Sequence, residues 1–394
     1  MDFGFDDTGA NGVDADPLAG DFAGEADGEG VDGALGGGVV DVLAGAAEPI
    51  YYGVSGPFSG DRASYGAVWK KGMTMAADEI NAQGGIKGRK VELVWQDTQS
   101  DPKQSVPVAQ KFVDDPRIIA ELGDFSSAAS MAASPIYERG KLIQFGLTNS
   151  DPKFTRGGEW MFSTAPTMQM DAALMADIAL KNLGKKAAVF YQASDWGDTS
   201  QQVFVERFKS RGGNVVALEN YLLTDKDYHS VLAKARRADP DVLVLFSYYT
   251  DGALLLLQAQ DVGLKGKILA ATSCYSNKFL ELGGSAVNGT VMSVLFFPED
   301  PRPAIQAFVK AYKARYNETP DQYAARAYDA LKIVAWGTEH GGATREGIRQ
   351  AFVSGTNIPS LLFGSFKFDA ERRVAQYDEA LITVRNDKFA YFNS

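Results

Sequence analysis

The segment between Arg117 and Asp151 constrains the fold of this chain more than any other stretch. It opens with an apolar run, Ile118 to Leu122, that has the length and composition of a short buried strand. Residues 128–139 then repeat small and apolar side chains at a helical spacing, and a second apolar run follows from Leu142 to Phe145. The pattern predicts a strand–helix–strand unit within a parallel sheet, because parallel neighbours need a crossover connection of this kind.

Hydroxylated residues occupy the two loops that follow these predicted strands. Ser126 or Ser127 lies where a helix N-cap belongs, so that a side-chain oxygen accepts a backbone N–H. Small ligands bind at the carboxyl ends of strands in open parallel sheets, and the first turn of a helix attracts anions such as carboxylates. The simplest interpretation of the two serines is a helix cap alone, so a binding site needs support from the rest of the chain.

Strand-like and helix-like segments alternate along most of the remaining chain. Strands are predicted at residues 50–54, 91–95, 187–191, 215–218, 242–246 and 268–271. Helices are predicted at residues 65–81, 171–183, 228–237 and 251–262; one more helix begins at residue 102, and another ends at residue 211. Three further helices, at 303–316, 322–340 and 344–353, precede two strand-like pieces at 366–368 and 379–384. This order predicts an α/β protein with two doubly wound parallel sheets.

Cofactor, metal and catalytic sites find little support in the composition. Cys274 is the single cysteine, which excludes an internal disulfide, and the two histidines, His229 and His340, have no metal-ligand spacing. No phosphate-binding G-x-x-x-x-G-K-[ST] segment is present, and no nucleophile has a base nearby in sequence. We therefore predict no cofactor, no metal and no catalytic residue, and interpret Cys274 as a buried inert thiol.

The first 48 residues differ from the rest of the chain. They contain twelve Asp or Glu residues and no Lys or Arg, so subtracting them from the formal charge of −11 leaves about +1 for the remainder. A Gly-rich acidic segment with few large apolar residues is expected to be a disordered tail. It lacks the basic start and apolar middle of a secretory signal. We expect that the natural gene product carries an export signal and that this N-terminus is altered.

A series of short motifs gives the chain a resemblance to a known family. The motifs are Ala77-Asp78-Glu79-Ile80-Asn81-Ala82-Gln83-Gly84-Gly85-Ile86-Lys87-Gly88-Arg89-Lys90-Val91, Asp97, Ser100-Asp101-Pro102-Lys103-Gln104, Phe125-Ser126-Ser127 and Thr148-Asn149-Ser150-Asp151-Pro152. In this order they resemble the periplasmic substrate-binding proteins of ABC transporters for branched-chain amino acids, the leucine/isoleucine/valine-binding family. The resemblance covers roughly residues 49–390.

The resemblance implies an architecture and a function. The fold would be the type I periplasmic binding fold, with one lobe from residues 49–168 plus 297–363, another from 169–296 plus 364–394, and a three-segment hinge. A periplasmic monomer would capture an amino acid, aromatic acid or amide between the lobes and deliver it to a membrane permease, with no nucleic-acid partner.

The resemblance also implies a set of pocket residues. Ser127 would hold the ligand carboxylate at a helix N-terminus, with Ser126, Thr148, Asn149 and Ser150 around it. Four aromatic residues would cover the rest of the ligand: Tyr65, Trp196, Tyr249 and Tyr323. Relatives that bind leucine carry a glutamate near Thr272 and Ser273 for the ligand ammonium group, and this chain has none there. Because a buried ammonium needs a partner, Asp124, Asp171 and Asp251 are the candidate substitutes.

Two alternatives from other functional classes remain open at this stage. A ligand-sensing regulatory or receptor module of the same fold would capture the same kind of ligand but signal instead of transporting it. An enzyme would need an assembled nucleophile, metal or phosphate loop, none of which is visible. The aromatic residues favour a ligand with a larger apolar or aromatic side group.

Overall fold

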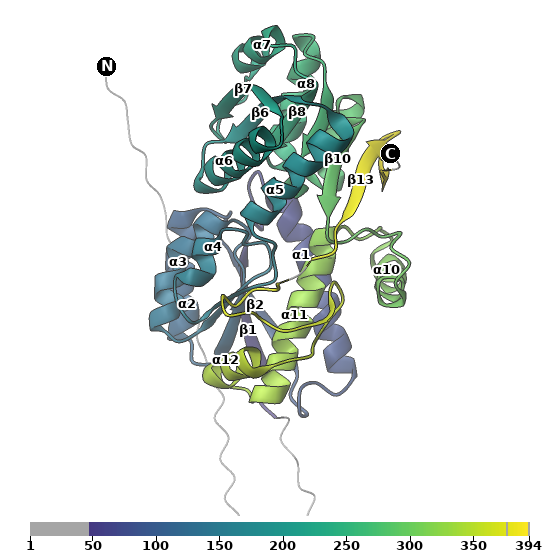
Figure 1. Cartoon of the computed structure of the whole chain (residues 1–394). Coiled ribbons are helices and arrows are strands. Elements are labelled where there is room, and N and C mark those ends of the chain that lie inside the picture. Colours follow the sequence, from purple (N-terminus) through teal and green to yellow (C-terminus); the bar gives the residue numbers. More distant parts are fainter. Residues whose placement is uncertain (1–46, 376, 393–394) are drawn as a thin grey trace, which may run out of the picture. The chain divides into compact units, whose positions relative to one another are not determined.

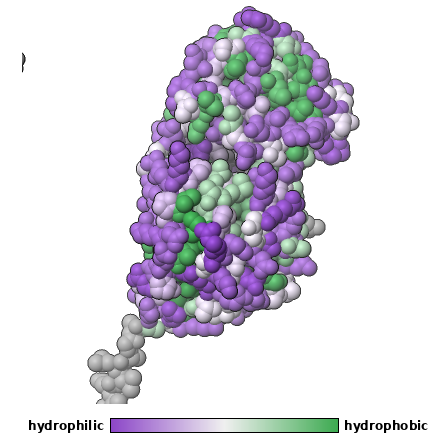
Figure 2. Space-filling view, turned by 90° about the vertical axis from the view of Figure 1, so that its left-hand side faces the viewer, coloured by the Kyte–Doolittle hydropathy of each residue, from purple (hydrophilic) through white to green (hydrophobic). Residues whose placement is uncertain are grey.

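The computed structural model describes residues 47–375 and 377–392 (Figure 1). The predicted disordered tail, residues 1–48, therefore lies outside the described residues except for its last two positions. Within the described part, no helix has both the length and the apolar character needed to cross a bilayer. Hydrophilic side chains predominate on the face in Figure 2, with hydrophobic side chains gathered in a few patches.

A five-stranded parallel sheet forms the core of the first lobe. Its strands are β1 (Ile50–Gly56), β2 (Val91–Asp97), β3 (Ile118–Leu122), β4 (Ile143–Gly146) and β5 (Met161–Ser163), in the spatial order β2-β1-β3-β4-β5. All neighbouring pairs are parallel, as predicted. The sequence pattern missed only the short strand β5 at the sheet edge.

Helices cover both faces of this first sheet (Figure 1). They are α1 (Ala63–Ala82), α2 (Pro102–Asp114), α3 (Ser127–Arg139), α4 (Pro152–Arg156), α11 (Gln322–Gly341) and α12 (Arg345–Ser354). Helix α10 (Pro303–Tyr316) packs on α1 and α11 instead of on the sheet. Phe112 of α2 and Tyr137 of α3 are buried in one cluster, whereas Trp69 of α1 and Leu331 of α11 are buried in another. The late helices α11 and α12 thus return to the first lobe, which their lack of nearby strands predicts.

Local capping explains where two of these helices begin. Asp101 caps α2 by accepting the N–H of Lys103, and Pro102 occupies the first helical position, where its missing donor has no cost. Ser126 caps α3 by accepting the N–H of Ala129 at 3.2 Å. Ser126 is therefore the N-cap and Ser127 is the first helical residue, which decides between the two predicted positions.

A seven-stranded sheet forms the core of the second lobe. Its strands are β6 (Lys186–Gln192), β7 (Asn214–Tyr221), β8 (Val242–Phe246), β9 (Lys267–Ala270), β10 (Thr290–Val294), β13 (Ala380–Arg385) and β14 (Lys388–Tyr391), in the order β14-β13-β10-β9-β8-β6-β7. The pairs from β7 to β10 are parallel, but β13 pairs antiparallel with β10 and β14 antiparallel with β13. This antiparallel edge was not predicted, because a short terminal run carries no signal for its direction.

Helices also cover both faces of the second sheet. They are α5 (Met168–Ile178), extended by a π-helical turn at Ala179–Leu183, and α6 (Asp195–Ser210), α7 (His229–Arg237), α8 (Tyr249–Asp261) and α9 (Asn277–Gly283). Successive strand residues point to opposite faces. Accordingly, Val244 packs with α5 and α6, whereas Leu245 packs with α7, α8 and α9.

The last segment that passes from the first lobe to the second still contacts the first lobe after residue 364, where the prediction begins the second lobe. Strand β12 (Gly364–Phe366) pairs with β11 (Ile358–Ser360), and the Phe368 ring lies 5.1 Å from that of Phe162 in the first lobe. The Arg373 guanidinium donates to the carbonyl oxygens of Asn149 at 3.0 Å and Asp151 at 2.6 Å. We propose that the lobe boundary lies between Val374 and Ala380.

Candidate ligand-binding site

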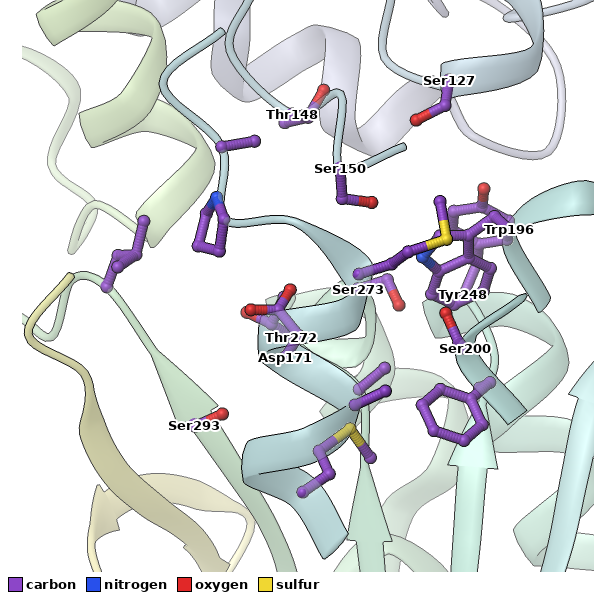
Figure 3. A pocket seen from close by; sticks show the side chains of 18 of the residues that line it. Ser127, Thr148, Ser150, Asp171, Trp196, Ser200, Tyr248, Thr272, Ser273 and Ser293 are labelled. Carbon is purple, nitrogen blue, oxygen red and sulfur yellow. The ribbon is translucent and has the colours of Figure 1, made fainter. Parts of the chain in front are cut away.

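A cavity lies at the carboxyl ends of strands from both sheets (Figure 3). Its lining comes from loops and helix starts that are far apart in the sequence. The lining residues are Phe125, Ser126, Ser127, Thr148, Ser150, Ala165, Pro166, Met168, Asp171, Ala172, Met175, Trp196, Ser200, Phe246, Tyr248, Ala271, Thr272, Ser273, Ser293, Leu295, Tyr323, Arg326 and Glu379. Both lobes contribute, as expected for a ligand held between them.

The first lobe contributes hydroxyl groups and a helix N-terminus. Figure 3 shows the hydroxyls of Ser127 and Ser150 directed into the same space. The Ser127 oxygen accepts the N–H of Asp151 at 3.3 Å, so its proton remains available to a ligand. Thr148 instead donates its hydroxyl to the Phe125 carbonyl at 2.8 Å and shapes the loop. The free donors and the positive end of α3 together suit an anion such as a carboxylate.

Three charged groups of the cavity lining come from distant parts of the chain. Asp171 lies in the first turn of α5, Arg326 on α11, and Glu379 immediately before β13. Ser293 of β10 lies in the same cavity lining as Asp171 and Glu379. Arg326 is buried and donates to the Leu147 carbonyl at 3.1 Å. The cavity wall therefore holds two acidic groups and one basic group.

Burial shifts the protonation of the two acidic groups. Loss of hydration and the neighbouring Glu379 charge raise the pKa of Asp171 well above its usual range, although Arg326 opposes this. Burial also raises the pKa of Glu379, while the Ser293 hydroxyl and Arg326 oppose that rise. A neighbouring negative charge disfavours ionisation of a carboxyl group. The pair therefore retains a proton more readily than an isolated carboxyl group does.

Of the three predicted partners for a ligand ammonium, Asp171 is the one in the cavity lining. Asp124 is buried in the first lobe, where the hydroxyls of Thr98 and Ser100 bond its carboxylate. Asp251 is buried in the first turn of α8 and accepts the Tyr221 hydroxyl and the Tyr248 N–H. Because both have protein donors and no contact with the cavity, they serve the packing of their own lobes.

Aromatic side chains form one wall of the cavity, although not with the predicted membership. Trp196 and Tyr323 line it, as predicted. Phe125 and Tyr248 also line it, although the sequence does not predict them as ligand-binding residues. The Trp196 ring stacks on that of Tyr248 at 5.3 Å with an interplanar angle of 28°, and Figure 3 shows both at the same side of the cavity. The indole and phenol faces thus offer a flat apolar surface to a ligand.

The structure places Tyr65 and Tyr249 behind this wall and outside the cavity lining. The Tyr65 ring stacks on Phe125 at 4.0 Å, and its hydroxyl donates to the Ser273 carbonyl and accepts the Tyr249 N–H. The Tyr249 hydroxyl donates to the Asp61 carbonyl at 2.8 Å. These bonds join the first lobe to the second, so the two tyrosines hold the lobes together beside the cavity.

Three further predicted residues have partners within the protein. Asn149 is fully buried and donates its amide to the Ser130 hydroxyl at 2.6 Å, so it supports the loop from outside the lining. Thr272 and Ser273 do line the cavity. The Thr272 hydroxyl accepts the Gln322 amide at 2.6 Å, and the Ser273 hydroxyl donates to the Ser247 carbonyl at 2.6 Å.

An apolar recess of the cavity reaches into the second lobe. Ala172 and Met175 of α5 face it, together with Phe246 at the end of β8 and Ala271 after β9. Ser200 of α6 adds one hydroxyl. The sequence pattern identified these residues only as core positions, because a recess that extends a core has the same apolar periodicity as the core itself.

Cys274 and His229 both lie outside the cavity lining. Cys274 is fully buried, its thiol contacts the Ser247 carbonyl at 3.3 Å, and burial raises its pKa well above the usual range. His229 is exposed and pairs with Asp227 at 2.6 Å, outside the lining. Among residues 47–375 and 377–392, no group of three or more His, Cys, Asp or Glu side chains is arranged to hold a metal ion.

Comparisons with known proteins match nearly all of the described chain. A family model described as "Periplasmic binding protein" matches residues 49–388. The Leu/Ile/Val-binding protein homolog 3 of Brucella melitensis is 29% identical over 297 residues, 75% of this chain and 80% of the relative. Residues 49–388 contain every residue that lines the cavity and every strand of the two sheets except β14, which begins at Lys388.

Two solved structures share the fold at similar identity. A leucine-binding protein from Thermotoga maritima is 26% identical with a TM-score of 0.82, over 87% of this chain and 98% of that chain. A branched-chain amino acid transporter substrate-binding protein from Streptococcus pneumoniae, solved in complex with isoleucine, is 26% identical with a TM-score of 0.81, over 86% and 97%. The two-lobe α/β architecture predicted from the sequence is thereby confirmed.

Proposed function

This chain belongs to the periplasmic binding protein family, and on that premise we propose that it captures a small α-amino acid between its lobes and presents it to the permease of an ABC transporter. Capture of a small solute is the family's role. The finer statements are proposals: the amino acid as ligand, the permease as partner, a location outside the cytoplasmic membrane, and action as a monomer. No catalytic step is required of the site.

One observation carries the choice of ligand: donors and acidic groups line the same cavity. Ser127, Ser150 and the first turn of α3 suit a carboxylate, whereas Asp171 and Glu379 suit an ammonium group. An α-amino acid carries both charges on neighbouring atoms. Charge-assisted hydrogen bonds contribute about 1.5–3 kcal/mol each, and a buried ammonium without an acidic partner would be strongly disfavoured. The pairing therefore favours a zwitterion over a simple acid.

The apolar recess indicates the kind of side chain that the ligand carries. Ala172, Met175, Phe246 and Ala271 offer no partner for a charged group, so a charged side chain placed there would lose its hydration without compensation. A branched aliphatic side chain fits this chemistry. The leucine-binding and isoleucine-bound relatives support the same choice. An aromatic side chain is the second candidate, because the Trp196 and Tyr248 rings present a flat surface beside the recess.

Mass spectrometry of small molecules retained through purification, followed by calorimetry, tests this function. The titrated set contains leucine, isoleucine and phenylalanine, with 4-methylpentanoate as leucine without its amino group and leucinamide as leucine without its carboxylate. We expect an amino acid to bind at least about tenfold more tightly than either analogue, the equivalent of one 1.4 kcal/mol contact. Tighter binding of 4-methylpentanoate than of every amino acid would overturn the proposal.

The permease and sensor alternatives are separated by a different experiment. Capture of the ligand-loaded protein by membranes of the native host, followed by cross-linking and mass spectrometry, should recover an ABC permease. Recovery of a receptor or a regulatory protein in its place would favour the sensing module. Fractionation of the same host tests the location, and protein confined to the cytosol would contradict it.

A further inference from the structure

Two tyrosines beside the cavity form hydrogen bonds from one lobe to the other. Tyr65, in the first turn of α1, donates its hydroxyl to the Ser273 carbonyl of the second lobe and accepts the N–H of Tyr249 at 3.3 Å. The Tyr249 hydroxyl, at the start of α8, donates to the Asp61 carbonyl of the first lobe at 2.8 Å. The start of α1 and the start of α8 are therefore bonded to each other in both directions.

The first turn of α11 adds a second group of bonds between the lobes. Gln322 donates its amide to the Thr272 hydroxyl at 2.6 Å and to the Thr272 carbonyl at 3.0 Å. Tyr323 donates its hydroxyl to the same carbonyl at 3.2 Å. Asp321 caps α11 by accepting the Tyr323 N–H at 2.9 Å, so the first lobe alone holds these two donors in place. The bonded residues, which we call the interlobe clasp, are Tyr65, Tyr249, Thr272, Ser273, Gln322 and Tyr323.

The bonds of the clasp join protein to protein and use no atom of a ligand. Thr272 and Ser273 line the cavity, but their carbonyl oxygens accept donors of the first lobe. The Ser273 hydroxyl donates to the Ser247 carbonyl at 2.6 Å. Tyr65 and Gln322 lie outside the lining and are 1% and 0% exposed, so in the closed form water does not compete for their bonds. This side of the cavity can therefore close before a ligand arrives.

The clasp lies away from one of the chain crossings between the lobes. Ser293 stands one residue before the end of β10, after which the chain returns to the first lobe at α10. Figure 3 shows Ser293 on one side of the cavity and Tyr248, the neighbour of Tyr249, on the other side with Trp196. A hinge motion concentrates its rotation in such connecting segments. Opening about this crossing would therefore separate the clasp partners more than it moves the residues near Ser293.

We propose that the interlobe clasp keeps the ligand-free protein mostly closed, so that Tyr65 and Gln322 are positioning residues that control entry to the cavity. Each buried hydrogen bond favours the state that contains it by a factor of about 2–10, and the bonds of the clasp break together when the lobes part. The inference rests on the capture of a solute between the lobes, which is part of the proposed function, and not on the choice of an amino acid.

A clasp of this kind has a kinetic signature. The ligand enters only while the lobes are apart, so the clasp slows association as well as dissociation. Its bonds form equally in the ligand-free and the ligand-bound closed forms, so the affinity changes much less than either rate. A residue that contacts the ligand, such as Ser127, differs, because its loss speeds dissociation without speeding association.

Small-angle X-ray scattering of the ligand-free full chain tests the closed state without any ligand. The double variant Tyr65→Phe with Gln322→Ala removes clasp bonds and should have a larger radius of gyration than the parent. Tyr65→Phe alone, which removes one hydroxyl, serves if the double variant folds poorly. Tyr316→Phe is the matched control, because its hydroxyl donates to the Lys71 carbonyl at 2.8 Å within the first lobe. Equal radii of gyration for the parent and the clasp variants would overturn the proposal.

Stopped-flow fluorescence with leucine, using Trp196 in the cavity lining as the probe, tests control of entry. Tyr65→Phe and Gln322→Ala should each raise both the association and the dissociation rate constant by up to about tenfold, with affinity within about threefold of the parent. Tyr316→Phe should change neither rate, and Ser127→Ala should raise dissociation alone. Unchanged association in both clasp variants would overturn the proposal. If leucine and the other amino acids fail to bind, the proposed ligand is wrong, while the scattering comparison still decides for or against the clasp.

Discussion

The two sides of the cavity are built in different ways. The first-lobe side uses Ser127 and Ser150, which lie at the ends of adjacent strands β3 and β4 and within 24 residues of each other. The opposite side joins Asp171, Arg326 and Glu379, which come from α5, α11 and the segment before β13. The comparison teaches that the proposed carboxylate site is a local property of one strand–helix–strand unit, whereas the proposed amine site requires both lobes and the last chain crossing.

The largest expected effect is a loss of ligand affinity, and it tests the side of the cavity that joins Asp171, Arg326 and Glu379. Asp171→Asn should weaken leucine binding by about 100-fold, because truncating one partner of a buried charge pair costs about 2–5 kcal/mol. The affinity for 4-methylpentanoate should stay within about threefold of the parent value, since this acid has no ammonium group. Calorimetry with both ligands provides the measurement. An equal loss for both would mean that Asp171 shapes the cavity without meeting the amine.

The aromatic wall should give the next largest effect. Trp196→Ala removes a large ring that stacks on Tyr248 and opens the cavity to water. We expect leucine affinity to fall by about 30-fold, or about 2 kcal/mol, from lost apolar contact. Leu257→Ala, on an exposed side chain of α8, is the control and should leave affinity unchanged. Parent-like binding by the Trp196 variant would place the ligand elsewhere.

Substitution of each of the two adjacent serines should separate ligand binding from protein stability on the first-lobe side of the cavity. Ser127→Ala removes a donor from the cavity and should weaken binding by about tenfold, or about 1.4 kcal/mol. Ser126→Ala removes the cap of α3 and should lower the free energy of unfolding by about 0.5–2 kcal/mol. Calorimetry and denaturant unfolding of both variants distinguish the roles. If Ser126→Ala weakens binding as much as Ser127→Ala, the division between cap and ligand donor is wrong.

The smallest effect concerns stability of the ligand-free protein. The folded-state pKa of Asp171 is raised, so the folded state binds more protons than the unfolded chain, and the stability contributed by this group is lost as pH rises through its folded pKa. Glu379→Gln removes the like charge. The melting temperature of the parent should therefore fall relative to that of the variant as the pH rises from about 4, the ordinary range of a carboxyl group, towards 8, by about 1–4 °C. Parallel melting curves for the two proteins would contradict the raised pKa.

Much of the fold and part of the site could be predicted from the sequence. The apolar run at Ile118–Leu122 became β3, and the predicted N-cap became Ser126, because strand burial and capping depend on a few neighbouring residues. Tyr65 resembled a pocket residue because it follows the first strand, yet its ring packs on Phe125 and its hydroxyl bridges the lobes. Packing of this kind depends on where α8 lies, which the neighbours of Tyr65 in the sequence do not determine.

The sequence by itself determined that this chain builds two α/β lobes and that a hydroxyl-lined helix N-terminus stands at the carboxyl edge of the first sheet. Those features follow from apolar periodicity and capping, which act over a few residues. Only the tertiary structure decided which of three candidate acidic residues lines the cavity. Asp124, Asp171 and Asp251 are chemically equivalent in the sequence, but Asp124 and Asp251 are bonded inside their own lobes. Asp171 instead lines the cavity together with Glu379, which comes 208 residues later. Electrostatic interactions depend on distance in space, and that distance is set only when the chain has crossed between the lobes for the last time.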